Sequence, residues 1–203
     1  MALLEDIKAT VERATGFGRP KPAALAALTR ARKPRVFLFK DDGATPNNRW
    51  PLLIYRAAVR LDDAYDPAAI FEALFARNGW RGSWRDGMYD WLHYHSNTHE
   101  VLGVARGWLK ARLGGSRGRA VRVAAGDVIV LPAGTGHFRI AASPDLLIVG
   151  AYPGRRKYDE CKPEDTREAI RRRIAYVPRP RKDPVFGADG PLFSAWKAQR
   201  VRS

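Results

Sequence analysis

The chain has 203 residues, a formal net charge of +15 and a single cysteine. Its hydrophobic content of 45% is that of a globular protein, which excludes wholesale disorder. The lone cysteine excludes an intramolecular disulfide framework and any zinc site built from several cysteines. No apolar run reaches the ~18 residues that a transmembrane helix needs, and the N-terminus does not resemble a signal peptide. We therefore expect a soluble, cytoplasmic protein of one domain with terminal extensions.

The positive charge alone does not identify a partner. Basic residues are spread along the chain, with a local density at Arg171, Arg172 and Arg173. Nucleic-acid binding would need interleaved aromatic residues and a recognisable reading element, and the sequence has neither. We therefore expect no nucleic-acid partner and no membrane partner, whereas an anionic small molecule remains compatible with the charge.

Residues 1–34 are predicted to form a peripheral helical extension. Leu4, Ile7 and Val11 recur at helical spacing, and a second, alanine-rich helix is predicted over 22–32.

The main domain is predicted over residues 35–160. It begins with two β-prone runs, 36–39 and 52–59, and continues with a helix over 66–79. Asp66 can cap the first free amides of that helix, and Pro67 suits its first turn.

After that helix the sequence consists of short segments rich in β-forming residues, which are separated by glycine-containing turns. Strands are predicted at about residues 89–95, 99–113, 119–123, 128–131, 136–141 and 146–151. Short strands at this spacing favour an antiparallel sandwich or barrel. Residues 161–203 are predicted to form a helical and irregular extension that packs on the barrel, with a helix over 163–176.

The four histidines of the chain carry the main chemical signal. On a strand, His93 and His95 would point to the same face because they are two residues apart. Glu100 opens the next segment and can return beside them, and His137 can join from a neighbouring strand. Three imidazoles and one carboxylate would bind a divalent transition metal. His99 is adjacent to Glu100, so on an extended strand it points away from the site.

The same residues carry a family resemblance. The first cupin motif is matched at every fixed position by Gly87, His93, His95, Glu100 and Gly107. The second is matched by Gly126, Pro132, Gly134 and His137. The chain therefore resembles the cupins. The segments FKDDGATPNN and HYHSNTHEVLGV further resemble the uncharacterised bacterial YjlB-like cupins, and that likeness extends over residues 35–200.

The resemblance implies a mainly β, single-domain cupin, a jelly-roll β-barrel with peripheral N- and C-terminal helices. It also implies one divalent metal ion, Fe, Mn, Ni, Cu or Zn, held by the residues that match the family's ligands: His93, His95, Glu100 and His137. One position departs from the pattern, because the second motif usually ends in Asn where this chain has Ala141. The missing polar group prevents the transfer of any particular cupin's reaction. Cupins of this kind commonly form homodimers, and segment 36–39 is a candidate for exchange between subunits.

Strand parity suggests further candidates around the metal. Trp91 shares parity with His93 and His95, so it is a candidate for a pocket wall that contacts substrate. Arg106 and Arg139 could bind a substrate carboxylate or phosphate, or both could lie in water at the barrel mouth. Glu100 is the candidate catalytic residue, since a carboxylate that detaches from the metal can move a proton.

Two functions are compatible with these residues. The first is a metal-dependent enzyme of the oxygenase, isomerase or decarboxylase type that acts on a small anionic organic molecule. The alternative is a non-catalytic cupin that binds a small ligand or a metal, for example as a sensor. The cupin fold does not decide between them.

Overall fold

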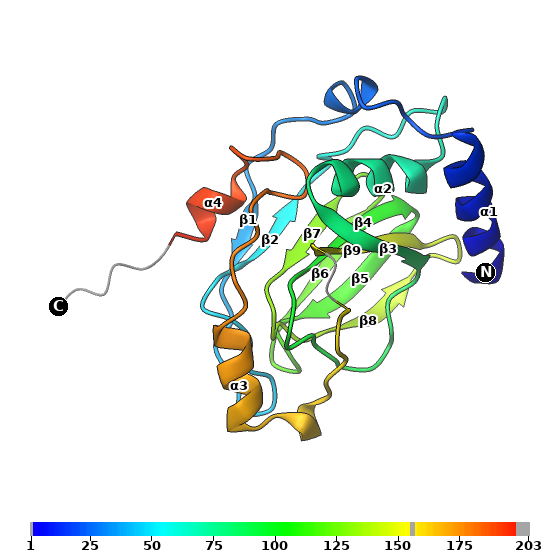
Figure 1. The fold of residues 1–203 in the computed structure, drawn as a ribbon. Helices are drawn as coiled ribbons and strands as arrows, with labels where there is room; N and C mark the ends of the chain where they lie inside the picture. The colour runs from blue at the N-terminus through cyan, green and yellow to red at the C-terminus, as the bar shows by residue number, and fades with distance from the viewer. Residues whose placement is uncertain (1, 155–156, 198–203) are drawn as a thin grey trace.

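The computed structural model describes residues 2–154 and 157–197, which form a mainly β protein with helices toward both ends (Figure 1). The described strands form two antiparallel sheets, one of six strands in the order β1-β2-β7-β4-β9-β3 and one of three in the order β6-β5-β8. The strands are β1 (Arg35–Phe37), β2 (Leu52–Tyr55), β3 (Trp80–Asp86), β4 (Glu100–Arg106), β5 (Trp108–Leu113), β6 (Arg119–Ala124), β7 (Val128–Leu131), β8 (His137–Ala142) and β9 (Leu147–Pro153). The helices are α1 (Ala2–Thr15), α2 (Pro67–Arg77), α3 (Glu168–Ala175) and α4 (Leu192–Ala195). The predicted mainly β architecture is confirmed.

The six-stranded sheet is buried on both faces. On one face Leu52, Leu102 and Ile129 pack against apolar residues of the three-stranded sheet. On the other face Leu53 and Val101 pack against α2 and aromatic residues from the C-terminal part of the chain. Because alternate residues face different apolar layers, these strands appear in the sequence as continuous apolar runs. The sheet therefore forms the central layer of the protein, and its strand ends can hold side chains in fixed positions.

Helix α2 begins where the sequence predicts. The Asp66 carboxylate accepts a hydrogen bond of 3.1 Å from the backbone amide of Ala69, and Pro67 occupies the first turn. The helix lies close to the sheet at Gly103 of β4, where a Cβ atom would come within 2.3 Å of the Phe71 ring. The missing side chain therefore sets how closely α2 can cover the central strand.

Helix α1 is held against the rest of the protein by ion pairs. Arg85 of β3 is only 2% exposed and lies 2.7 Å from Glu12 of α1. It also contacts Asp66 at 2.9 Å and Glu72 at 3.0 Å, with Glu5 at 3.7 Å. We call Arg85 and these four carboxylates the Arg85 cluster. It joins α1, α2 and β3, so the N-terminal extension is fastened to the domain by buried ion pairs.

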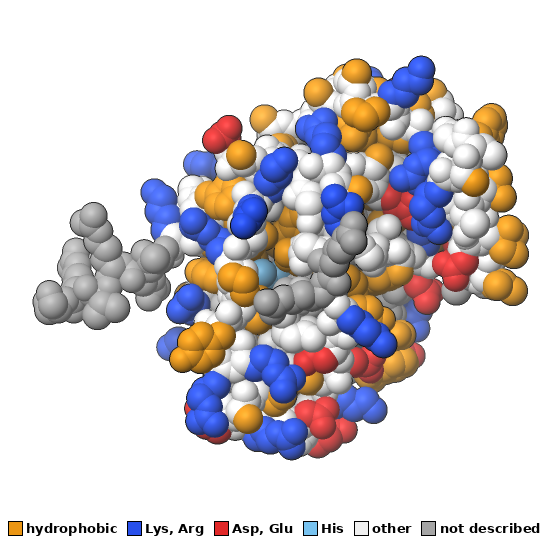
Figure 2. Space-filling view, in the orientation of Figure 1, with side chains coloured by type: hydrophobic (Ala, Val, Ile, Leu, Met, Phe, Trp, Pro, Cys, Tyr) orange, Lys and Arg blue, Asp and Glu red, His pale blue; other side chains and the backbone are white. Residues whose placement is uncertain are grey.

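The large apolar side chains of α1 face away from the protein body, whereas the small Ala9 is buried with the acidic residues. The exposed ones are Leu3, Leu4, Ile7 and Val11. Figure 2 shows hydrophobic side chains gathered along the edge that α1 occupies in Figure 1. The helical spacing in the sequence is thus confirmed, but the buried side of this helix is its charged side.

The helix predicted over 22–32 is wrong. Only Ala24–Ala26 form a 3₁₀ turn, and the chain then becomes extended. Thr29 forms a β-bridge with Val59, flanked by a hydrogen bond of 2.9 Å from the amide of Arg30 to the carbonyl of Ala58. Pairing with the chain beyond β2 therefore overrides the helix propensity of the alanines.

The strand predicted over 89–95 is also wrong. This segment makes only two isolated bridges, His93 with His137 and Tyr94 with Cys161. The preceding segment forms strand β3, which was not predicted, because glycine and charged residues interrupt its apolar pattern.

Two further segments are divided in the structure. The predicted strand 99–113 is two strands, β4 and β5, which belong to different sheets. Gly107 lies between them with a φ of +67°, a conformation that favours glycine. The helix predicted over 163–176 is a 3₁₀ turn at Pro163–Asp165 followed by α3. No helix in the described parts of the chain is long and apolar enough to cross a membrane.

The Arg85 cluster leads to a prediction about stability. The change Arg85→Met removes the shared counterion of four carboxylates, so we expect a loss of about 3–5 kcal/mol in the free energy of unfolding at neutral pH. Urea unfolding measures this loss, and the exposed Arg81→Met on the same strand is the matched control. An equal, small effect of the two changes would contradict the role of the cluster.

The same cluster predicts how this difference changes with pH. Burial alone would raise the pKa of Asp66 and Glu72, but hydrogen bonds and charge from Lys8, Arg85 and Arg19 lower both. Their contribution to stability is present above their ordinary values of 3.8 and 4.5 and is lost as pH falls through the lowered values. In Arg85→Met, Asp66 and Glu72 lose this cationic partner, so protonation of their buried carboxylates stabilises the folded variant. The stability gap between wild type and variant should therefore narrow as pH falls toward about 4, and a constant gap would contradict it.

Candidate metal centre

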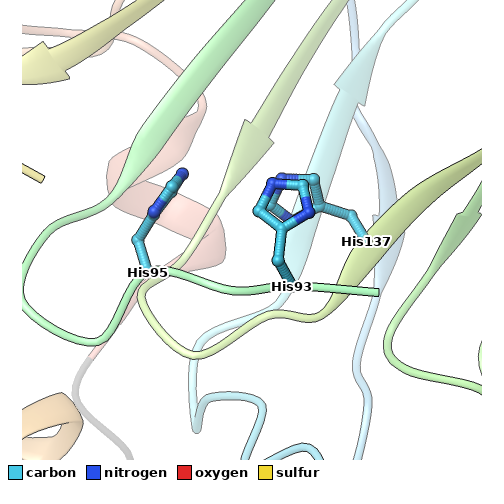
Figure 3. A group of neighbouring side chains, drawn as sticks. All are labelled: His93, His95 and His137. Carbon is cyan, nitrogen blue, oxygen red and sulfur yellow. The ribbon is translucent and has the colours of Figure 1, made fainter. Parts of the chain in front are cut away.

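Three of the four histidines converge beside Glu100, the first residue of β4. His137 is the first residue of β8 and forms an antiparallel bridge with His93 through hydrogen bonds of 3.0 and 3.3 Å. His95 follows two residues later on the same segment as His93 (Figure 3). Ring nitrogens of the three side chains lie within 4.8 Å of one another, and all three residues are buried. The spacing of the histidines in the sequence is thus sufficient to bring them together, although the segment is not a regular strand.

Backbone carbonyls fix how the three rings are oriented. The Nδ1 atom of His93 lies 3.2 Å from the carbonyl oxygen of Trp91, and that of His137 lies 3.0 Å from the carbonyl oxygen of Thr135. The Nδ1 atom of His95 is hydrogen-bonded to the carbonyl oxygen of Asp159. A carbonyl oxygen only accepts, so each Nδ1 carries the proton. Each Nε2 is then left free as the metal-binding nitrogen.

Glu100 adds a carboxylate to this group. It is the first residue of β4, and its Oε2 lies 3.4 Å from His95 Nε2 and 3.5 Å from His137 Nε2. This oxygen is buried and has no hydrogen-bond partner within the described residues. An unpaired buried carboxylate oxygen is costly, whereas a cation among three imidazole nitrogens would satisfy it. The residues therefore fit a divalent metal ion.

Burial and the neighbouring charges shift the pKa values of Glu100 and the three histidines. Burial would raise the pKa of Glu100, but the charge of the neighbouring His95 lowers it to about 2. Burial would lower the pKa of His95, but the Glu100 carboxylate raises it. For His137, burial and the neighbouring His93 lower the pKa to about 3, and burial also lowers that of His93. Two of the imidazoles are thus held neutral, as metal ligands must be.

His99 lies outside this group, as predicted from its parity. It is fully buried, and its Nδ1 accepts a hydrogen bond of 2.9 Å from the amide of Ala133. Its Nε2 lies 3.2 Å from the carbonyl oxygen of Pro178, and its ring contacts those of Trp50 and Trp196. His99 therefore joins the site loop to the C-terminal extension and carries its proton on Nε2.

A cavity of about 200 Å³ adjoins the metal-ligand candidates. His93, His95, His137 and Glu100 all line it, together with aromatic side chains from several elements. Those aromatic residues are Trp84, Tyr89, Tyr152 and Tyr158. Asp6 of α1 also reaches the lining, so the N-terminal helix contributes to the cavity wall.

Tyr152 is a lining residue whose hydroxyl group lies next to a metal-ligand candidate. Its hydroxyl accepts a hydrogen bond of 2.8 Å from Trp84 Nε1 and lies beside the Glu100 carboxylate. Burial and the charge of Glu100 raise the pKa of Tyr152, so the hydroxyl keeps its proton at neutral pH. Tyr152 was not predicted from the sequence as a residue of the site. Its parity with Ile148 and Gly150 on β9 was the available signal, because alternate residues of a strand share a face.

The three substrate candidates lie outside the cavity lining. Trp91 is 44% exposed and stacks on Tyr89 with ring centroids 4.1 Å apart. Arg106 donates to Glu5 of α1 at 2.6 Å, and Arg139 lies 3.4 Å from Asp90. The parity rule placed Trp91 beside the histidines, but residues 89–95 are not a strand. Contact of these three residues with substrate stays a prediction.

The ring orientations predict a spectroscopic pattern. At a pH of about 9, where free imidazoles are neutral, long-range proton–nitrogen correlation spectra of the metal-free protein should show three histidines protonated on Nδ1 and one on Nε2. The exception should be His99, assigned by its loss in His99→Asn. A spectrum in which His93 or His137 carries its proton on Nε2 would contradict the carbonyl arrangement.

The comparisons with known proteins identify the family of the chain. The family model described as Cupin matches residues 85–156. The chain is 37% identical over 168 residues to the uncharacterized protein YjlB of Bacillus subtilis (strain 168), an alignment that covers 81% of this chain and 98% of that protein.

Two solved structures illustrate the more distant similarity. An acireductone dioxygenase from Bacillus anthracis, solved with a cadmium ion in its active centre, is 16% identical, with a TM-score of 0.34. It matches 48% of this chain and 68% of its own. An oxalate decarboxylase from Bacillus subtilis is 19% identical, with a TM-score of 0.34 over 61% of this chain. The chain spans only 30% of that decarboxylase. On its identity to YjlB over nearly the full length of that relative, and on the match to the family model, the chain belongs to the cupins and to their YjlB-like branch.

Proposed function

We propose that the protein is a metal-dependent enzyme in which His93, His95, His137 and Glu100 hold one divalent transition metal ion. The observation that carries this proposal is the buried Glu100 Oε2, which has no hydrogen-bond partner among the described residues and faces two imidazole nitrogens. Imidazole and carboxylate ligands suit iron, manganese, nickel, copper and zinc. When bound, such an ion supplies Lewis-acid or oxygen chemistry.

The cavity supports a small substrate. Its volume of about 200 Å³ is below the ~300–1,000 Å³ of pockets for drug-sized ligands. A divalent ion with three neutral imidazoles and one carboxylate carries a net charge of about +1, which favours an anionic group on the substrate. Arg106 and Arg139 are each already paired with a carboxylate. Arg85, which does line the cavity, is paired with the carboxylates of the Arg85 cluster. The net positive charge of the metal site is therefore the feature that would attract the anionic group.

The protein's own groups support proton movement in the cavity. Tyr152 keeps its hydroxyl proton beside Glu100 and can donate it to a substrate oxygen. Glu100 is ionised at neutral pH and can accept a proton if it leaves the metal. Aromatic side chains form part of the wall around these groups. An oxygenase, an isomerase or a decarboxylase could each use one acid and one base placed in this way.

The alternative function, a sensor without turnover, receives less support from the site. Ala141 replaces the Asn that usually ends the second cupin motif, and a polar group missing from the site would favour a function without turnover. Ala141 is exposed and is not among the cavity-lining residues. The absence of a polar group at position 141 therefore removes no polar contact from the cavity. The homodimer and the cytoplasmic location stay predictions.

Metal affinity tests the proposed ligand set. We expect Glu100→Gln to weaken binding of zinc or manganese by at least ~10–100-fold, the loss typical of outer partners of a metal site. The physical reason is that the change removes a negative ligand from a buried site. Competition with a chromophoric chelator measures the affinity, and Glu160→Gln, an exposed carboxylate near Trp91, is the matched control. Wild-type affinity in Glu100→Gln would contradict the carboxylate as a ligand.

Turnover tests the enzyme function. Wild type reconstituted with each candidate metal is incubated with small carboxylic acids, and oxygen uptake, carbon dioxide release and product formation are followed. We expect conversion of at least one compound that disappears in the metal-free protein and in His137→Ala. Ligand binding with no conversion of any compound by any metal form would favour the sensor instead.

A further inference from the structure

His95 is held differently from the two other histidines of the cluster. The carbonyl oxygens that orient His93 and His137 come from Trp91 and Thr135, each two residues earlier in the chain. The carbonyl oxygen that orients His95 comes from Asp159, 64 residues later. Two of the rings are therefore positioned by their own segments, whereas the third depends on a distant one.

The side chain of Asp159 fastens that distant segment to the loop that follows His95. Its carboxylate accepts hydrogen bonds from the backbone amides of Ser96 at 2.7 Å and Asn97 at 3.2 Å, and from the Ser96 hydroxyl at 2.5 Å. In return, the Asn97 side chain accepts from the amide of Asp159 at 3.2 Å and donates to the carbonyl of Lys157 at 3.0 Å. Hydrogen bonds to an ionised acceptor are the stronger kind.

Other contacts of residues 157–161 support the same arrangement. Cys161 exchanges two backbone hydrogen bonds of 2.9 Å with Tyr94, the residue between the two ligand candidates. Tyr158 lines the cavity, and its ring centroid lies 5.0 Å from that of His95. Arg173 of α3 lies 3.2 Å from the Asp159 carboxylate. The segment thus forms one wall of the cavity and reaches the metal centre through a single histidine.

We propose that Asp159 is a positioning residue for the metal centre: its carboxylate fastens segment 157–161 to Ser96 and Asn97, and this places its own carbonyl oxygen on Nδ1 of His95. Asp159 does not contact the metal position itself, so its effect acts through the ring orientation and tautomer of His95. The inference rests on the proposed function in one respect, since it takes His95 Nε2 to be a metal ligand. Segment 157–161 thereby becomes part of the metal site.

The test compares Asp159→Ala and Asp159→Asn with Asp165→Ala. Asp165 is an exposed carboxylate of the same extension that accepts from the amide of Lys162 and has no contact with His95 among the described residues. We expect Asp159→Ala to weaken cobalt(II) or zinc binding by about 10–100-fold. Asp159→Asn keeps an oxygen acceptor for the two backbone amides, so it should recover part of the affinity. Asp165→Ala should bind as wild type.

Two spectroscopic measurements separate positioning from a general loss of stability. In metal-free Asp159→Ala, proton–nitrogen correlation spectra should show His95 shifting toward the Nε2-protonated form while His93 and His137 stay unchanged. The visible spectrum of the cobalt(II) form should change in Asp159→Ala and return toward wild type in Asp159→Asn. If Asp159→Ala does not fold, Asp159→Asn carries the test through the same two spectra.

The outcomes distinguish this inference from the function it rests on. Wild-type metal affinity and an unchanged His95 tautomer in the Asp159 variants would overturn the positioning role and leave the metal site standing. A wild-type protein that binds no metal would overturn the proposed function, and the His95 tautomer in the metal-free variants would still decide whether Asp159 positions that ring. An equal change in all three histidines would also overturn the inference, because it would indicate general loosening.

Discussion

The structure around the site depends on one buried carboxylate oxygen. Glu100 Oε2 lies out of water between two imidazoles, where it lacks a hydrogen-bond donor among the described residues. Such a group is tolerated only when something compensates its charge. Its position is rigid because Glu100 begins β4, which lies between β7 and β9 in the six-stranded sheet. The sheet therefore fixes the carboxylate, while the segment before β4 brings His93 and His95 to it and the first residue of β8 brings His137.

Two segments outside the sheets, α1 and residues 157–161, add to the cavity lining, and the second also orients a metal-ligand candidate. Helix α1 is fastened by the Arg85 cluster and contributes Asp6 to the cavity lining. Residues 157–161 contribute Tyr158 and orient His95. Both of these segments lie outside residues 85–156, which match the cupin family model. The metal-ligand candidates and most of the cavity lining thus belong to the part of the chain that matches the family model, and the two outer segments add Asp6 and Tyr158 to that lining.

The sequence was sufficient for the features that depend on local spacing. It predicted the cap of α2 at Asp66 and the pairing of His93 with His95, because both depend on neighbouring residues. His137 is distant in the chain, and it was grouped with them through the match to the second cupin motif. It could not predict Arg85 as a buried residue, since the four carboxylates that stabilise it come from distant segments. Asp159 was missed for the same reason: its partners Ser96 and Asn97 are more than 60 residues away. Parity also misplaced Trp91, because that argument assumes a regular strand where the chain makes only isolated bridges.

The metal content of the purified protein tests the central claim most directly. The protein is prepared without chelator or affinity metal and compared with the double variant His93→Ala/His95→Ala by elemental analysis. The account predicts a near-stoichiometric divalent metal per chain in the wild type and its loss in the double variant, with both proteins folded. A wild-type protein that takes up no metal, even after reconstitution with iron, manganese, nickel and zinc, would contradict it.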